Sequence, residues 1–286
     1  MARMVSGKVL PWRRFSVPQG KTISAGDDGR SFLDEPEGEF GLSRNPDVLK
    51  IDDLLQRPCI VLSGQPGIGK TVEFNSLRDR QTDWVAPDKT LIDFHCRHVT
   101  SPEALRLETV ESTRWKNALG RGGKIRLLID GVDEALSRVS VLVPALAQWL
   151  RNEPLEHIRL ILVCRSAEWH LADTNALRQL WDVQEPNIVF ELCLLRWKDA
   201  ELAARESGVD PQSFWQEIVR HQVKGLAARP ITLGMLLEEM NERGSLPVSH
   251  HQLFANAITR ICRESPERAR YSPQPRPNPG ISESGI

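Results

Sequence analysis

Five short apolar runs divide the first two thirds of the chain. They cover residues 59–63, 90–95, 125–130, 159–164 and 188–194. Stretches of helical periodicity separate them, and this alternation is typical of parallel strands joined by helical crossovers. The pattern predicts an α/β fold: a five-stranded parallel sheet flanked by helices. Pro144 interrupts the helical stretch after the third run, so we expect a kink or a restart near Leu142.

The strand pattern ends at Lys198. Apolar residues then recur at helical spacing over 198–207, 211–225, 230–242 and 249–263. We therefore expect a core over residues 45–196 and a small, all-helical C-terminal subdomain over 197–263. Residues 1–44 are rich in Gly, Pro and Ser and predict an irregular lead-in, whereas 264–286 predict a disordered, proline-rich tail.

A complete phosphate-binding loop follows the first apolar run. It consists of Gly64, Gln65, Pro66, Gly67, Ile68, Gly69, Lys70 and Thr71. Glycines at this spacing let successive backbone N–H groups converge on phosphate oxygens, and the helix that follows offers its positive end. In such a loop the lysine reaches the β- and γ-phosphates and the threonine holds Mg²⁺. We therefore expect nucleotide binding here, with Lys70 and Thr71 in these roles.

An acidic cluster closes the third apolar run. Asp130, Asp133 and Glu134 follow Arg126-Leu127-Leu128-Ile129, which predicts a central strand ending in acids. An acid placed there can bind Mg²⁺ or its waters, and a neighbouring acid can polarise an attacking water. We assign Asp130 to the metal, and Asp133 and Glu134 to the water, with Glu134 preferred as general base. A helix N-terminus alone would also explain Asp133 and Glu134.

The fourth run ends in Arg165. In an open parallel sheet, ligands gather at the carboxyl ends of the strands, so Arg165 is expected to face the γ-phosphate region as a nucleotide sensor. The alternative is a surface arginine that pairs with nearby Glu168. A further cluster of His95, Cys96 and His98 is too compact to surround one Zn²⁺, and we do not expect a metal there.

Together these motifs resemble the NACHT group of STAND nucleotidases, the signalling switches of innate immunity and bacterial antiviral defence. The resemblance rests on the phosphate loop, on Leu127-Leu128-Ile129-Asp130-Gly131-Val132-Asp133-Glu134-Ala135, and on 164–169, which looks like bacterial members. It covers roughly residues 45–262. It also implies that Pro230, in Ala228-Arg229-Pro230-Ile231, touches the nucleotide base. Family members continue into a winged helix and a repeat sensor, so this chain, which stops at Ile286, is expected to be truncated or split.

Composition adds mainly exclusions. The net charge is −1 over 286 residues, so bulk basicity gives no indication of nucleic-acid binding. Five cysteines without a Cys-x-x-Cys pair are expected to be buried, reduced thiols of a cytoplasmic protein. No apolar run is long enough to span a bilayer, so no membrane partner is expected.

Three functions stay open on the sequence. The first is a switch controlled by ATP and ADP with Mg²⁺, with slow hydrolysis and with a protein partner or self-assembly through the nucleotidase domain. The second is an AAA-type motor or loader that turns over ATP continuously. The third is a truncated remnant that binds nucleotide and signals nothing.

Overall fold

A computed structural model describes residues 10, 12–23, 32–80, 88–181, 187–247, 249 and 251–256. The strands are β1 Phe15–Pro18, β2 Leu49–Lys50, β3 Cys59–Ser63, β4 Lys89–His95, β5 Lys124–Asp130, β6 Ile158–Val163 and β7 Val189–Leu192. The helices of the first two thirds are α1 Gly41–Arg44, α2 Ile51–Leu54, α3 Lys70–Arg80, α4 Pro102–Glu108, α5 Thr113–Gly120, α6 Val132–Leu136, α7 Leu142–Leu150 and α8 Leu171–Trp181. They are followed by α9 Trp197–Glu206, α10 Pro211–Arg220, α11 Lys224–Ala227 and α12 Pro230–Arg243.

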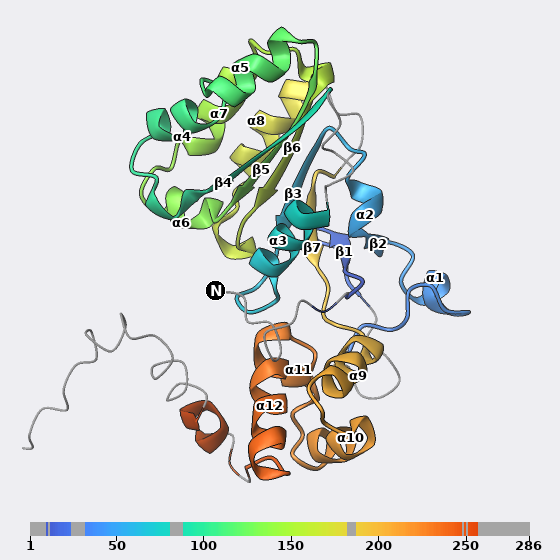
Figure 1. Cartoon of the computed structure of the whole chain (residues 1–286). Coiled ribbons are helices and arrows are strands. Elements are labelled where there is room, and N and C mark those ends of the chain that lie inside the picture. Colours follow the sequence, from blue (N-terminus) through green and yellow to red (C-terminus); the bar gives the residue numbers. More distant parts are fainter. Residues whose placement is uncertain are drawn as a thin grey trace, which may run out of the picture.

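The strands form one seven-stranded sheet in the order β2-β1-β7-β3-β6-β5-β4 (Figure 1). The five strands from β7 to β4 are parallel and lie where the apolar runs predicted them. β1 and β2 add an antiparallel edge, with β1 paired to β7. The sheet is therefore mixed, and it is wider than the five parallel strands predicted. The lead-in is also not wholly irregular, because its Phe15–Pro18 segment is a strand of this sheet.

Helices cover both faces of the parallel strands. Successive strand residues point to opposite faces, so Cys59 and Val61 join one apolar cluster while Ile60 and Leu62 join another. The first cluster packs beneath α4, α5, α7 and α8, and the second beneath α2 and α3 (Figure 1). Because both of their faces are buried, β3 and β6 read as nearly continuous apolar runs, whereas β4 at the edge of the sheet buries only Ile92.

The C-terminal helices α9–α12 pack around an apolar cluster of their own, which includes Phe214, Leu233 and Leu237. The stretch expected to be helical over 211–225 is interrupted after Arg220, where Gln222 takes φ 57° and α11 restarts the helix. The helical stretch after the acidic cluster also restarts, as expected, with α7 at Leu142. Residues 251–256 are helical. Residues 257–263 and the tail 264–286 lie outside the described residues, as does most of the N-terminal end of the lead-in.

Four of the five cysteines fall in the described ranges, at 59, 96, 164 and 193, and all four are buried and free of disulfides. Burial raises the pKa of the Cys96, Cys164 and Cys193 thiols to about 12. These thiols are inert packing groups at neutral pH. Within the described ranges, no helix combines the length and apolar character needed to cross a membrane.

Candidate functional site

The phosphate-binding loop lies between β3 and α3. Gly67 and Gly69 have φ values of 80° and 94°, a left-handed conformation that side chains other than glycine rarely adopt. Ile68 is buried beneath the loop in the apolar cluster shared by α2 and α3. Gly64 is buried at the end of the strand, whereas Gln65 and Pro66 are exposed at the crest. The first helical bond of α3 runs from Glu73 N–H to the Gly69 carbonyl at 2.9 Å. Strand, loop and helix therefore have the arrangement that phosphate binding needs.

The Lys70 side chain folds back over this loop. Its Nζ donates to the Gly64 carbonyl at 2.7 Å and to the Gln65 carbonyl at 3.0 Å. Burial lowers the pKa of Lys70, while the charge of Asp133 opposes that shift. The ammonium is thus held beside the place where phosphates would lie, and it is near enough to the acidic cluster to sense its charge.

The two expected Mg²⁺ ligands lie together. Asp130 ends β5 with 6% of its surface exposed, and the Thr71 hydroxyl donates to its carboxylate. Burial raises the pKa of Asp130, and the charge of His95 and the Thr71 hydrogen bond partly offset the shift. One hydroxyl and one carboxylate suit Mg²⁺, which usually completes its shell with waters and substrate phosphates. The described residues contain no group of three or more His, Cys, Asp or Glu side chains arranged to hold a metal.

His95 is a neighbour of the site that sequence analysis did not assign to it. Its Nδ1 lies 3.4 Å from Asp130 Oδ2, and its ring lies 4.7 Å from that of Phe74 on α3. The pairing follows from register, because His95 on β4 is opposite Asp130 on β5. The sequence gives no strand register directly, so His95 was considered only as part of a compact cluster with Cys96 and His98, where no metal was expected.

Arg165 and Asp133 form a two-point contact. The Arg165 Nε lies 2.9 Å from Asp133 Oδ2, and the Arg165 backbone N–H donates to Asp133 Oδ1 at 3.2 Å. Asp133 is buried, whereas half of the Arg165 side chain is exposed. The ion-pair partner of Arg165 is thus Asp133, where the sequence suggested Glu168 as the alternative. Because β6 lies between β3 and β5, Arg165 follows the strand that separates the phosphate loop from Asp130.

Glu134 has a different environment from Asp133. Its side chain is 41% exposed, and its Oε2 lies 3.8 Å from Arg97 Nε. Gly131 precedes the pair with φ 71°, which explains why a small residue follows Asp130. Asp133 is therefore held in a buried ion pair, while Glu134 keeps a carboxylate that solvent can reach.

The N-terminus of α12 lies directly on the phosphate loop. Arg229 Nη2 donates to Gln65 Oε1 at 3.0 Å. A β-carbon on Gly67 would come within 2.7 Å of Ile231 Cγ2, and one on Gly69 within 3.1 Å of Pro230 Cγ. Pro230 is buried and occupies the first turn of α12, where its missing N–H costs nothing. The structure thus brings Pro230 to the loop.

No family model matches the sequence, and no curated protein matches it. Among solved structures, a Walker-type ATPase of Pyrococcus abyssi aligns at 14% identity with a TM-score of 0.43, over 78% of this chain and 74% of that one. Cdc6p of Pyrobaculum aerophilum aligns at 14% identity with a TM-score of 0.44, over 68% and 60%. RuvB of Thermotoga maritima aligns at 12% identity with a TM-score of 0.42, over 73% and 65%.

The fold assignment rests on the chain's own geometry: the loop between β3 and α3, and the acidic end of β5 two strands away. The chain has a P-loop NTPase fold. The likeness to the NACHT group is a resemblance of sequence motifs.

Proposed function

We propose that the chain binds ATP or ADP with Mg²⁺ at the phosphate loop and acts as a nucleotide-controlled switch of the NACHT type. One observation carries the proposal: α12 begins on the loop itself, through the Arg229–Gln65 hydrogen bond and the contacts of Pro230 and Ile231 with Gly69 and Gly67. A ligand can shift a two-state equilibrium only by binding the states differently. Contact between loop and helix is a direct route for such a difference.

The site residues divide into distinct roles. The loop backbone cradles the phosphates, and Lys70 leaves the Gly64 and Gln65 carbonyls for the β- and γ-phosphates. Thr71 and Asp130 would hold Mg²⁺, and the ion would neutralise phosphate charge. These assignments agree with the contact of Thr71 with Asp130.

Hydrolysis uses the remaining polar groups. Glu134 orients and activates the attacking water, because its carboxylate is accessible while that of Asp133 is engaged by Arg165. Asp133 holds Arg165 toward the γ-phosphate region. We expect slow turnover by the isolated chain, well below the roughly 1–100 s⁻¹ of kinases, because an arginine supplied by another subunit is worth about 10³–10⁵ in rate and an isolated chain does not receive one.

The helices α9–α12 act as the moving part, a helical subdomain whose placement depends on the nucleotide. Complete reversal of a two-state equilibrium needs about 5.5 kcal/mol of differential binding. Lys70, Arg165 and the Mg²⁺ ligands together can supply such a difference through γ-phosphate contacts. The output is passed to a protein partner or to further copies of this chain, in a cytoplasmic defence response of the kind the family resemblance implies.

Calorimetry with ATP and ADP in Mg²⁺ buffer tests the binding step. Lys70→Ala removes a charge-assisted phosphate contact while the loop backbone can still form, so we expect affinity to fall at least about tenfold. Lys116→Ala, at an exposed position on α5, is the matched control and should bind like the wild type. Equal affinity of the Lys70 variant and the wild type would remove the assignment. Rapid, continuous hydrolysis by the wild type would favour the motor over the switch.

A further inference from the structure

Arg14 is a buried arginine that bridges two separate parts of the site. It immediately precedes β1 and is 7% exposed. Its Nη2 donates to the Ile68 carbonyl at 3.0 Å and to the Cys193 carbonyl at 2.9 Å. Ile68 belongs to the phosphate loop, whereas Cys193 belongs to the segment that joins β7 to α9. One guanidinium nitrogen thus links the phosphate loop to the segment that leads into the C-terminal helices.

The charge of Arg14 is balanced from the same two sides. Burial lowers the pKa of Arg14, and the charges of Glu73 and Asp199 oppose that shift. Glu73 lies in the first turn of α3, directly after the loop, and Asp199 lies in the first turn of α9. The other guanidinium nitrogen, Nη1, lies 3.2 Å from the position a β-carbon on Gly69 would take. Both the hydrogen bonds and the electrostatics of Arg14 therefore depend on where the loop and α9 lie.

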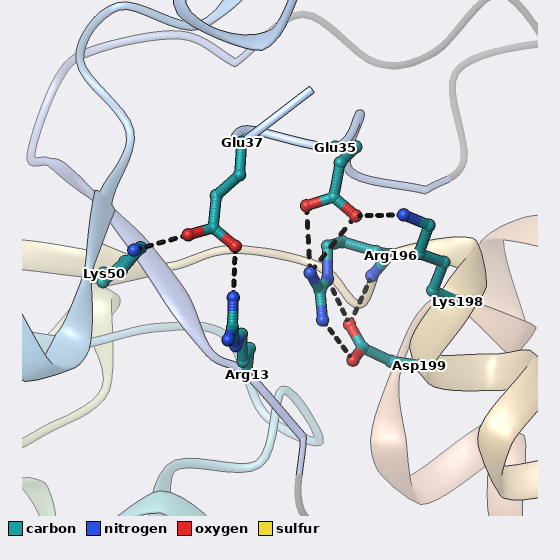
Figure 2. Close-up of polar contacts among 7 residues, drawn as sticks. All are labelled: Arg13, Glu35, Glu37, Lys50, Arg196, Lys198 and Asp199. Atoms are coloured by element: carbon teal, nitrogen blue, oxygen red, sulfur yellow. Dashed lines mark hydrogen bonds and ion pairs between the residues drawn. The ribbon is translucent and has the colours of Figure 1, made fainter. Parts of the chain in front are cut away.

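The neighbours of Arg14 fix the lead-in to the same connection. Figure 2 shows Arg196 between two carboxylates, with Nη1 3.0 Å from Glu35 and Nη2 2.8 Å from Asp199. The Arg196 guanidinium also lies over the Phe15 ring, 5.1 Å from its centroid. Leu33 N–H donates to the Leu195 carbonyl at 3.0 Å. The lead-in thus contacts the segment 193–199 through Phe15, Leu33 and Glu35. Arg14 also contacts this segment, and it reaches the phosphate loop as well.

The outer half of the same cluster lies at the protein surface. Arg13 and Lys50 both contact Glu37 (Figure 2), and the Arg13 side chain is 66% exposed. Arg13 therefore offers a matched comparison for Arg14: it is the same residue type, one position earlier in the same segment, and its side chain pairs with Glu37 at the surface.

We propose that Arg14 is a positioning residue that couples the phosphate loop to the placement of α9–α12. This inference rests on the proposed function. A buried guanidinium cannot leave a carbonyl partner without losing a charge-assisted hydrogen bond that no water replaces. Any turn of the Ile68 peptide on phosphate binding changes the fit of Arg14, and Arg14 passes the change to Cys193. The loop thus communicates with α9 through the sheet side, independently of the Pro230 contact.

The test compares Arg14→Met, Arg14→Lys and Arg13→Met by hydrogen exchange and calorimetry, each with and without ADP. Methionine fills much of the same volume but has no donors, so we expect nucleotide-dependent protection of residues 195–206 to be lost and affinity to fall roughly tenfold. Lysine keeps a charge and several donors and should recover part of both. Arg13→Met should behave as the wild type. A purely structural role would lower stability in Arg14→Met while leaving the nucleotide-dependent difference in protection intact.

The outcomes separate this inference from the proposed function. If the wild type binds no nucleotide, the proposed function fails and the coupling fails with it. If the wild type binds nucleotide and Arg14→Met keeps both affinity and the protection difference, only the role of Arg14 is overturned. If Arg14→Met does not fold, hydrogen exchange of the wild type tests the proposal instead. The Cys193 and Leu195 amides donate to the Phe15 and Ala228 carbonyls, and the proposed coupling requires ADP to change the exchange rates of these two amides. Unchanged exchange there overturns the proposal.

Discussion

Pro230 lies against Gly69, so close that a β-carbon on the glycine would sit 3.1 Å from the Cγ of the proline ring. The first turn of α12 therefore packs on the residue where the phosphate loop becomes α3. Residues that are 161 positions apart in sequence, at 69 and 230, share one contact. Changes on either side of this contact should be felt on the other.

Gly69→Ala should destabilise the chain even without nucleotide. The substitution forces φ of 94° on a residue with a side chain and crowds both Pro230 and Arg14, so we expect a loss of about 1–3 kcal/mol. Gly234→Ala is the matched control, because Gly234 lies inside α12 with no heavy atom near its β-carbon position. There alanine should stabilise by about 0.5–1 kcal/mol. Urea unfolding of both variants measures the difference, and equal stability of the two would contradict the packing.

Hydrogen exchange tests whether Pro230 contacts the nucleotide base. If the ring lies against adenine, ADP should increase the protection of residues 226–242. Pro230→Ala keeps α12 in place through Arg229 and Ile231 and should reduce that increase. Identical protection with and without ADP in the wild type would leave Pro230 as a helix-starting residue only.

Glu134→Gln should keep nucleotide affinity and suppress turnover. The amide has nearly the shape of the carboxylate but cannot accept a proton, so the loss belongs to the chemical step. Single-turnover hydrolysis and calorimetry on the same preparation separate the two effects. A Gln variant that hydrolyses ATP at the wild-type rate would exclude Glu134 as the base.

Asp133→Asn should differ from Glu134→Gln by also costing stability. Asp133 is buried and holds Arg165 by two contacts, so loss of its charge should destabilise by about 1 kcal/mol, a modest value because half of Arg165 is in water. Thermal unfolding of both variants is the measurement. If only the Glu134 variant lost stability, the assignment of the two acids would be reversed.

Glu35 gives a prediction for pH. Burial alone would raise the pKa of Glu35, but its hydrogen bonds and charge pairing with Arg196 and Lys198 outweigh burial and lower the pKa below its ordinary value of 4.5. The stabilisation is therefore complete above that value and is lost as the pH falls through the lowered, folded-state pKa. Glu35→Gln should be less stable than the wild type at pH 7, and the gap should close in acid. Glu108→Gln, at an exposed position of α4, should show no such gap at either pH.

The parallel strands and the phosphate loop could be predicted because each has a strong local signal. β3, β5 and β6 are buried along almost their whole length and are largely apolar, and the loop glycines are required by the backbone conformation of the loop. The sequence alone was enough to assign Asp130 and Thr71 to one site. Asp130 ends β5, Thr71 follows the loop after β3, and the carboxyl ends of parallel strands lie at the same edge of the sheet.

The rest depended on contacts that a sequence does not encode locally. β1 and β2 have four and two residues and are held by backbone pairing to β7 and to each other, so they lack a periodic signal. Apolar Phe15 and Val17 at alternate positions are the local sequence feature that favours a strand at β1. Arg14 falls in the predicted irregular lead-in, and its contacts could not be predicted because its two carbonyl partners lie 54 and 179 positions away. The helix break at Gln222 could not be predicted either, because the residue with positive φ is a glutamine, and the sequence there has no glycine or proline to indicate a break.

The buried cysteines provide a way to measure local opening of the fold, because they react with alkylating reagents only when they become exposed. Cys96 and Cys164 directly follow β4 and β6, at the edge where the candidate site lies. Burial raises both pKa values to about 12, and only the thiolate reacts with alkylating reagents. With Cys262 replaced by serine, the rate of alkylation at Cys96 and Cys164, resolved from Cys59 and Cys193 by peptide mass spectrometry, would measure how often this edge opens at neutral pH. A lower alkylation rate of these two thiols in the presence of ADP would show that bound nucleotide reduces the opening of this edge, and the ratio of the two rates would measure the effect.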